Sequence, residues 1–312
     1  MRPMPSAISP LPARAALTLA GVLLLLMFAV AHESTANTEQ RKATDSHLPQ
    51  IAPIGVPIRQ HLQIPEHAKG PPVDAVKGYR LEDFGGGLYM ITDNVYQSMI
   101  LVYETGVVVA DAPPSYATHL VEGIREVTDK PITHLIYSHS HVDHIGGATA
   151  LGPVATIIAH EETKRLLARA NDSKRPLPTV TFTDRYTLNV GTKTLQLSYH
   201  GVAHEPGNIF IYAPEQQVLM VIDVVFPGWM PWRRFALAQD VPGYFAQVET
   251  IKNVPFKTLI AGHVARAGTH ADVELQYQFL RELKVAAGKA LAATKAGAGL
   301  TPESLSNPWA VF

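Results

Sequence analysis

The feature that most constrains the fold is a six-residue segment at positions 139–144, which reads His-Ser-His-Val-Asp-His. Four of its six side chains belong to residue types that bind first-row metal ions. In an extended segment, side chains two positions apart point to the same side, so His139 and His141 can bind one ion together. Asp143 and His144 follow directly, and a turn can direct both toward a second ion. The spacing is unlike the His-Glu-x-x-His pattern of helical zinc sites.

Three further side chains of ligand type lie downstream, each at or just beyond the end of a predicted strand. His204 follows a strand ending near Tyr199, Asp223 ends an apolar strand, and His263 follows a short apolar strand. Polar residues at strand ends lie at a sheet edge, where loops gather and sites form. His200 is an alternative to His204 as the ligand. The alternative for Asp223 is an ordinary helix-cap or turn residue, and the alternative for His263 is a histidine at a strand end without a function.

Taken in order, these residues resemble the metallo-β-lactamase-fold hydrolase superfamily, over roughly residues 79–285. The resemblance implies an α+β fold, a four-layer αββα sandwich of two mixed β-sheets flanked by helices. It implies two metal ions at one edge between the sheets, expected to be Zn²⁺, with iron and manganese as alternatives. The implied ligands are His139, His141 and His204 for the first ion, Asp143, His144 and His263 for the second, and Asp223 bridging both. The Pro-Gly-Asn sequence at 206–208 fits the family's loop after His204, which favours it over His200.

Two positions narrow the activity that the resemblance implies. β-Lactamases of the first subclass carry Cys where this chain has Asp223, and lactonases, glyoxalase II-like thioesterases and alkyl sulfatases carry a bridging acid. Flavodiiron proteins carry an acid at the position of His141, so a redox role is disfavoured. We therefore expect hydrolysis of a small ester, lactone, thioester or lactam. β-Lactamase activity proper and alkyl or aryl sulfatase-like hydrolysis are alternatives, and a nuclease or a non-catalytic binding module is less favoured.

The donor types predict how such a site works. Imidazole and carboxylate donors suit Zn²⁺, and a bound ion lowers the pKa of water from 15.7 to about 7, so that a metal-bound hydroxide can act as the nucleophile. Asp143 is the predicted catalytic residue, which orients the hydroxide or shuttles its proton. Trp229, Trp232 and Tyr244, in the region after Asp223, are candidates to line the substrate pocket. Core packing or an interface is the alternative for the stretch from Trp229 to Trp232.

Composition limits the partners. The formal net charge is −1, with no basic surplus, so we expect a small-molecule substrate and no nucleic acid. The sequence has no cysteine, which excludes disulfides and thiolate ligands. Oligomeric state is left open.

The N-terminus has the pattern of a targeting segment. Arg2 and Arg14 both precede an uncharged, largely apolar run at 15–31. The sequence Ala-Val-Ala ends that run. We expect residues 1–31 to be a signal peptide cleaved after Ala31, which predicts a periplasmic or secreted protein without a membrane span. An uncleaved N-terminal membrane anchor is the alternative.

Patterning divides the remainder into a proline-dotted linker and extended arm, 32–78, and a catalytic domain, 79–312. Predicted strands lie at 88–92, 99–103, 106–111, 132–137, 154–159, 179–183, 186–188, 193–199, 208–213, 218–224 and 258–261. Predicted helices follow Pro113-Pro114-Ser115 and the turn at Gly146 and Gly147. Others cover 161–170 and 244–252, and the last runs from Thr269 to the glycines at 297 and 299.

Overall fold

The computed structural model describes residues 64–231 and 233–293. The predicted signal peptide, most of the predicted linker, Trp232 and the predicted helix stop at Gly297 and Gly299 lie outside these residues. Among the helices that the structure describes, none is long and apolar enough to cross a membrane.

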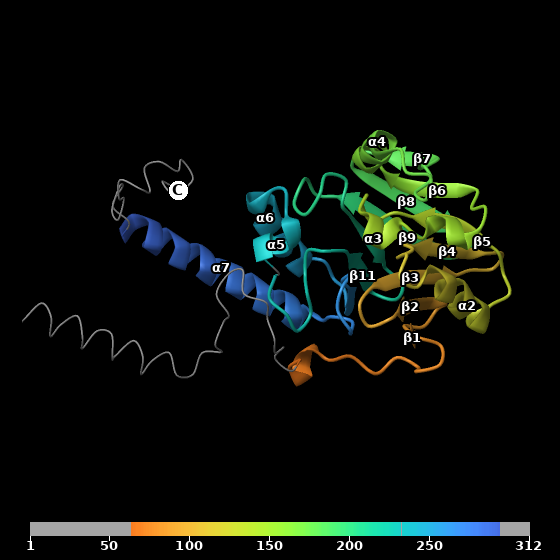
Figure 1. Ribbon diagram of the computed structural model, residues 1–312, viewed down its shortest axis with the longest axis horizontal. Coiled ribbons are helices and arrows are strands. Elements are labelled where there is room, and N and C mark those ends of the chain that lie inside the picture. Colours follow the sequence, from red (N-terminus) through yellow and green to blue (C-terminus); the bar gives the residue numbers. More distant parts are fainter. Residues whose placement is uncertain (1–63, 232, 294–312) are drawn as a thin grey trace, which may run out of the picture. The chain divides into compact units, whose positions relative to one another are not determined.

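The first half of the domain forms a seven-stranded sheet (Figure 1). Its first four strands pair antiparallel, and β4 to β7 then pair parallel. In order across the sheet they are β1 (Arg80–Asp83), β2 (Leu88–Thr92), β3 (Gln97–Val102), β4 (Val107–Ala110), β5 (Ile132–Ile136), β6 (Thr156–His160) and β7 (Val180–Phe182).

The second half forms a five-stranded sheet in the order β12-β11-β10-β9-β8. Only β11 and β12 pair parallel, and the other pairs are antiparallel. The strands are β8 (Arg185–Val190), β9 (Lys193–Tyr199), β10 (Ile209–Ala213), β11 (Val218–Val221) and β12 (Thr258–Ile260).

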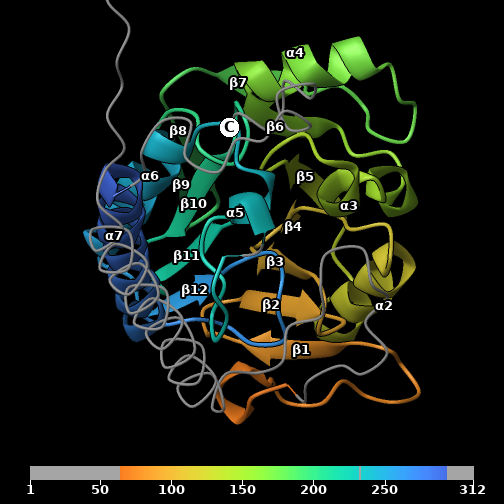
Figure 2. The ribbon, with the colours of Figure 1, turned by 60° about the vertical axis from the view of Figure 1, so that its left-hand side comes forward.

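Helices cover the outer face of each sheet (Figure 2). The helices are α2 (Ala117–Val127), α3 (Val142–Ile145), α4 (Glu161–Ala170), α5 (Arg233–Leu237), α6 (Val241–Lys252) and α7 (His270–Ala293), with 3₁₀ turns η2 (Glu66–Ala68) and η3 (Ala148–Leu151). Apolar residues of α2 pack on the seven-stranded sheet, and those of α6 and α7 pack on the five-stranded sheet. The predicted αββα sandwich of two mixed sheets is confirmed.

The central core lies between the two sheets, and β10 shows how sequence alternation builds it. Ile209 and Ile211 point into the layer between the sheets, and Phe210 points outward against Tyr244 and α6. Successive side chains on a strand face opposite sides, so a strand covered on both faces is apolar throughout. The four residues of β4 are buried for the same reason.

Two elements differ from the prediction. β1 was not predicted because its sequence, Arg-Leu-Glu-Asp, offers one apolar side chain, as suits the exposed edge of a sheet. The helix expected after the glycines at 146 and 147 is instead α3, which begins at Val142 within the ligand-rich segment, and η3 follows the glycines.

The described part of the arm, residues 64–78, leads along the domain into β1. Arg266 donates from Nε to the carbonyl of His67 over 2.7 Å, and Asn94 donates from Nδ2 to the carbonyl of Pro71 over 2.9 Å. These bonds tie the arm to loops that flank the ligand-rich edge of the sandwich.

Candidate metal centre

All the predicted ligands lie at the edge of the sandwich where the carboxyl ends of β5 and β12 meet. The 139–144 segment follows β5, and His263 follows β12. The backbone N–H of Gln97, at the start of β3, donates to the carbonyl of Gly262 over 2.8 Å. This hydrogen bond joins the two sheets at this edge. Gly262 has φ +90°, and a Cβ there would lie 2.5 Å from Ile222, so the close approach requires glycine.

The structure brings the seven predicted side chains together in two neighbouring groups. The ligand atoms within each group lie within 4.8 Å of one another. One group contains His139, His141, His204 and Asp223, and the other contains Asp143, His144 and His263. These are the two sets that the resemblance implies, with Asp223 in the first.

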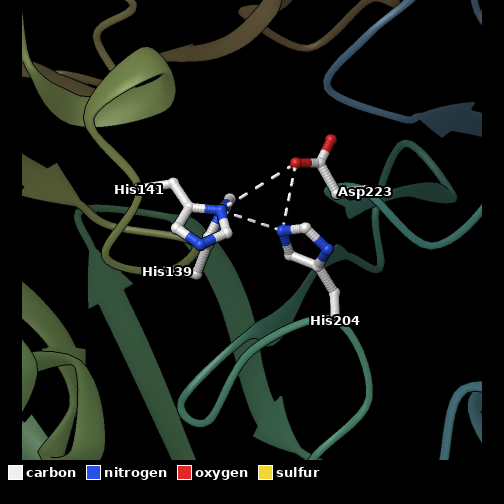
Figure 3. A group of neighbouring side chains, drawn as sticks. All are labelled: His139, His141, His204 and Asp223. Carbon is white, nitrogen blue, oxygen red and sulfur yellow. Dashed lines mark hydrogen bonds and ion pairs between the residues drawn. The ribbon is translucent and has the colours of Figure 1, made fainter. Parts of the chain in front are cut away.

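Asp223 lies between the two groups. Its Oδ2 is 3.0 Å from Nε2 of His144 and 3.3 Å from Nε2 of His204, and its Oδ1 is 3.3 Å from Nε2 of His263. In Figure 3 its carboxylate points toward the imidazoles of His139 and His204. A carboxylate in contact with both groups is placed to bridge two ions.

The donor set fits a metal ion. His139 is fully buried, its Nε2 has no hydrogen-bond partner, and the nearest Asp223 oxygen is 3.8 Å away. A buried lone pair without a partner costs free energy that a bound cation removes. Imidazole nitrogens with carboxylate oxygens, and no thiolate, suit Zn²⁺ and also the other divalent first-row ions.

Burial and neighbouring charges shift the pKa values of three of these histidines. Burial lowers the pKa of His139 well below the usual value and lowers the pKa of His204 to about 4, so both imidazoles keep a free lone pair. At His144 burial also opposes the charged form, but the carboxylates of Asp223, Asp111 and Asp143 outweigh it and raise the pKa to about 9. A metal ion would take the place of that proton.

A buried chain of hydrogen bonds orients His139. The Ser138 hydroxyl donates to Oδ2 of Asp111 over 2.6 Å, and its oxygen lies 2.9 Å from Nδ1 of His139. Since the hydroxyl has already donated its proton, Nδ1 of His139 is the donor and Nε2 is left as the free acceptor. Burial raises the pKa of Asp111 to about 6.

Both Asp111 and Asp223 have φ +62°, a left-handed conformation that Asp tolerates better than most residues.

A second buried carboxylate, Glu205, orients His141. It accepts hydrogen bonds of 2.9 Å from both the backbone N–H and the hydroxyl of Ser140, and lies 3.3 Å from Nε2 of His141. Arg175 donates to the Ser140 carbonyl over 2.6 Å and supports the same turn. With Nε2 held by Glu205, Nδ1 of His141 faces His204 at 2.9 Å. Sequence reasoning missed Glu205 and Asp111, because no spacing rule links them to the histidines that they contact.

Other expected residues lie elsewhere. Tyr244 is fully buried and its hydroxyl donates to the carbonyl of Val224, so the expectation that it lines a pocket is wrong. Trp229 is half-buried and borders a cavity with His263. His200, the alternative to His204, contacts Ser198 and Phe210 and belongs to neither ligand group.

Comparison with known proteins agrees with this architecture. The family described as the metallo-beta-lactamase superfamily matches residues 92–284. The chain is 30% identical over 186 residues to 2,4-dinitroanisole O-demethylase subunit alpha of Nocardioides sp. (strain JS1661), covering 53% of this chain and 57% of that protein. It is 30% identical over 127 residues to metallo-beta-lactamase type 2 of Bacillus sp. (strain 170), covering 39% of this chain and 47% of that protein.

A solved structure shows the same fold. The metallo-beta-lactamase from Pontibacter korlensis aligns with a TM-score of 0.58 at 19% identity, over 65% of this chain and 99% of that chain. The matches to the two curated relatives span only about half of each relative's length.

The Glu205 contacts predict a measurable role in metal binding. Glu205→Gln keeps the side-chain shape but removes the charge that holds His141, so we expect a 10- to 100-fold loss of metal affinity. Affinity would be measured by competition with a chromophoric chelator, and the exposed Glu215→Gln serves as the control. Unchanged affinity in the folded Glu205→Gln protein would show that His141 needs no such support.

Proposed function

Because this chain belongs to the metallo-β-lactamase superfamily and carries a buried histidine–aspartate metal-binding cluster, we propose that it is a dinuclear metallo-hydrolase acting on a small ester, lactone, thioester or lactam. The observation that carries the proposal is the pair of ligand groups that meet at Asp223. We propose Zn²⁺ as the ion, since imidazole and carboxylate donors suit it.

In this proposal His139, His141 and His204 would hold one ion, and Asp143, His144 and His263 would hold the other. Asp223 contacts residues of both ligand groups and would serve both ions. When bound, such ions act as Lewis acids on the substrate and lower the pKa of water to about 7. Ser138 and Glu205 keep His139 and His141 in the orientation that leaves one nitrogen of each facing the centre.

Asp143 is the proposed catalytic carboxylate. Its side chain is 41% exposed, whereas that of Asp223 is 6% exposed, so Asp143 is the acid that substrate and water can reach. Burial opposes its ionisation, but the hydrogen bond from His263 and the charge of His144 hold the pKa of Asp143 below its usual value. An ionised carboxylate there can orient a water molecule and accept its proton. Tyr96, with its hydroxyl 3.5 Å from Asp143 Oδ2, limits the orientations of this side chain.

A second candidate is the hydrolysis of an activated aryl ether. The relative from Nocardioides is named for 2,4-dinitroanisole, an aryl methyl ether, and the chain is 30% identical to it over 186 residues. The same Asp143 would serve, because water attacks an electron-poor carbon in both reactions. In the aryl ether the ring carbon gains the hydroxyl group and the methoxy group leaves as methanol, whereas an acyl substrate loses an alcohol, a thiol or an amine.

Metal content and a substrate panel test the proposal. We expect protein from residue 32 to contain two zinc ions per chain and to hydrolyse one class among a chromogenic cephalosporin, an acyl-homoserine lactone, a thioester, an aryl sulfate and 2,4-dinitroanisole. Elemental analysis and initial rates, before and after chelation, measure both. Bound zinc without turnover of any compound would favour a binding module, and bound iron would favour redox chemistry.

The role of Asp143 predicts a specific kinetic defect. Asp143→Ala removes an acid–base group, so we expect kcat/KM to fall at least 100-fold in protein that unfolds at the wild-type temperature. His119→Ala is the control, since His119 contacts Glu122 on the exposed surface of α2. Full activity in Asp143→Ala would assign the proton transfer to another group.

We also propose that the protein is exported, with cleavage after Ala31. The support is the charged start, the apolar run and the small residues that end it. Mass spectrometry of protein from a periplasmic fraction should find His32 as the first residue, whereas an intact N-terminus in the membrane fraction would identify an anchor.

A further inference from the structure

We propose that the cavity beside His263 binds an uncharged apolar acyl or aryl group of the substrate, and that the arm at residues 64–70 forms one wall of it. The inference rests on the proposed function, since it names the substrate class of the same site.

The cavity has the size of a small-molecule site and adjoins the ligand groups. Its volume is about 530 Å³, within the range that binds drug-sized molecules. It is lined by Ile64, Ala68, Lys69, Gly70, Asn94, Val95, Trp229, His263, Val264 and Ala265. Because His263 belongs to the second ligand group, a substrate group bound here is adjacent to the reacting bond.

Apolar side chains from separate segments face this cavity. Ile64 of the arm is 51% exposed, and Val95 at the tip of the β2–β3 hairpin is 54% exposed. Trp229 contributes a half-buried aromatic ring from the loop before α5. Exposed apolar side chains gathered around one cavity beside a reactive centre indicate a ligand with apolar surface.

The polar side chains that line the cavity are already paired. Nζ of Lys69 lies 2.5 Å from Oε1 of Glu66. Asn94 donates from Nδ2 to the Pro71 carbonyl, and its Oδ1 accepts from Nε of Arg80 over 3.3 Å. An anionic substrate group would therefore have to compete with Glu66 for Lys69, the one Lys or Arg among the described lining residues. This disfavours penicillins and cephalosporins, which carry a carboxylate.

Close backbone contacts hold the arm in place as a wall. A Cβ at Gly70 would lie 1.9 Å from the carbonyl oxygen of Ala265, and a Cβ at Gly228 would lie 2.6 Å from Cα of Ala68. The Arg266 bond to the His67 carbonyl adds a fixed polar contact. The arm at 64–70 is thus seated against the loop that carries His263 and against the loop at Gly228, and a side chain at 70 would push it away.

Acyl preference tests the cavity. We would compare phenylacetyl, acetyl and succinyl thioesters of one small thiol, and measure released thiol, to which this cysteine-free chain contributes none. We expect wild-type kcat/KM to be highest for phenylacetyl and lowest for succinyl. Val95→Asp places a charge in the cavity, so the phenylacetyl-to-acetyl ratio should fall about tenfold, through KM. Gly70→Val should lower the same ratio by displacing the arm.

The matched control is Val76→Asp, the same change at a residue that is 96% exposed and outside the cavity, which should keep the wild-type ratio. Equilibrium binding of the neutral fluorophore N-phenyl-1-naphthylamine to metal-loaded protein needs no turnover. Fluorophore binding that is weakened in Val95→Asp but not in Val76→Asp supports the cavity proposal. If every thioester is inert while this binding pattern holds, the inert thioesters count against the proposed function and not against the cavity. Equal binding by both variants, or a preference for succinyl, overturns the cavity proposal.

Discussion

The interaction on which the structure depends is the burial of the Asp223 carboxylate among imidazoles. Burial alone would raise the pKa of Asp223, but the charge of His144, its hydrogen bond and the other histidines hold it below its usual value. A buried charge is tolerated only when its partners are held in place. Those partners come from loops after β5, β9 and β12, so strands of both sheets must end at one edge, and the two sheets must pack to bring those ends together.

The fold was largely predictable because its strands are buried on one or both faces and their patterning is strong. β10 and β11 are examples, whereas β1 is polar, lies at a sheet edge and escaped prediction. The seven ligand-type residues were recognisable from spacing and order, and the structure gathers them, although metal binding itself stays a prediction. Glu205 and the cavity walls were not predictable, because they depend on contacts between segments far apart in the sequence.

In the function proposed above, reaction chemistry and substrate choice are located in different parts of the molecule. The ligand groups sit on strand ends of the rigid sandwich, where buried networks through Ser138 and Glu205 restrict each imidazole. The cavity is built by the arm, a hairpin tip and two loops, which can vary without altering the sheets. This division explains why membership of a superfamily identifies the reaction class more closely than it identifies the substrate.

Asp111 and Asp223 occupy corresponding places in the two halves. Each follows an inner strand that pairs in parallel with its neighbour, each has φ +62°, and each donates its backbone N–H to a carbonyl at the end of the neighbouring strand, Ile136 or Ala261. The same left-handed φ is therefore used once after each of the two inner strands. Asp223 belongs to the ligand groups, whereas Asp111 supports His139 from behind through Ser138, so one backbone conformation positions two carboxylates with different roles.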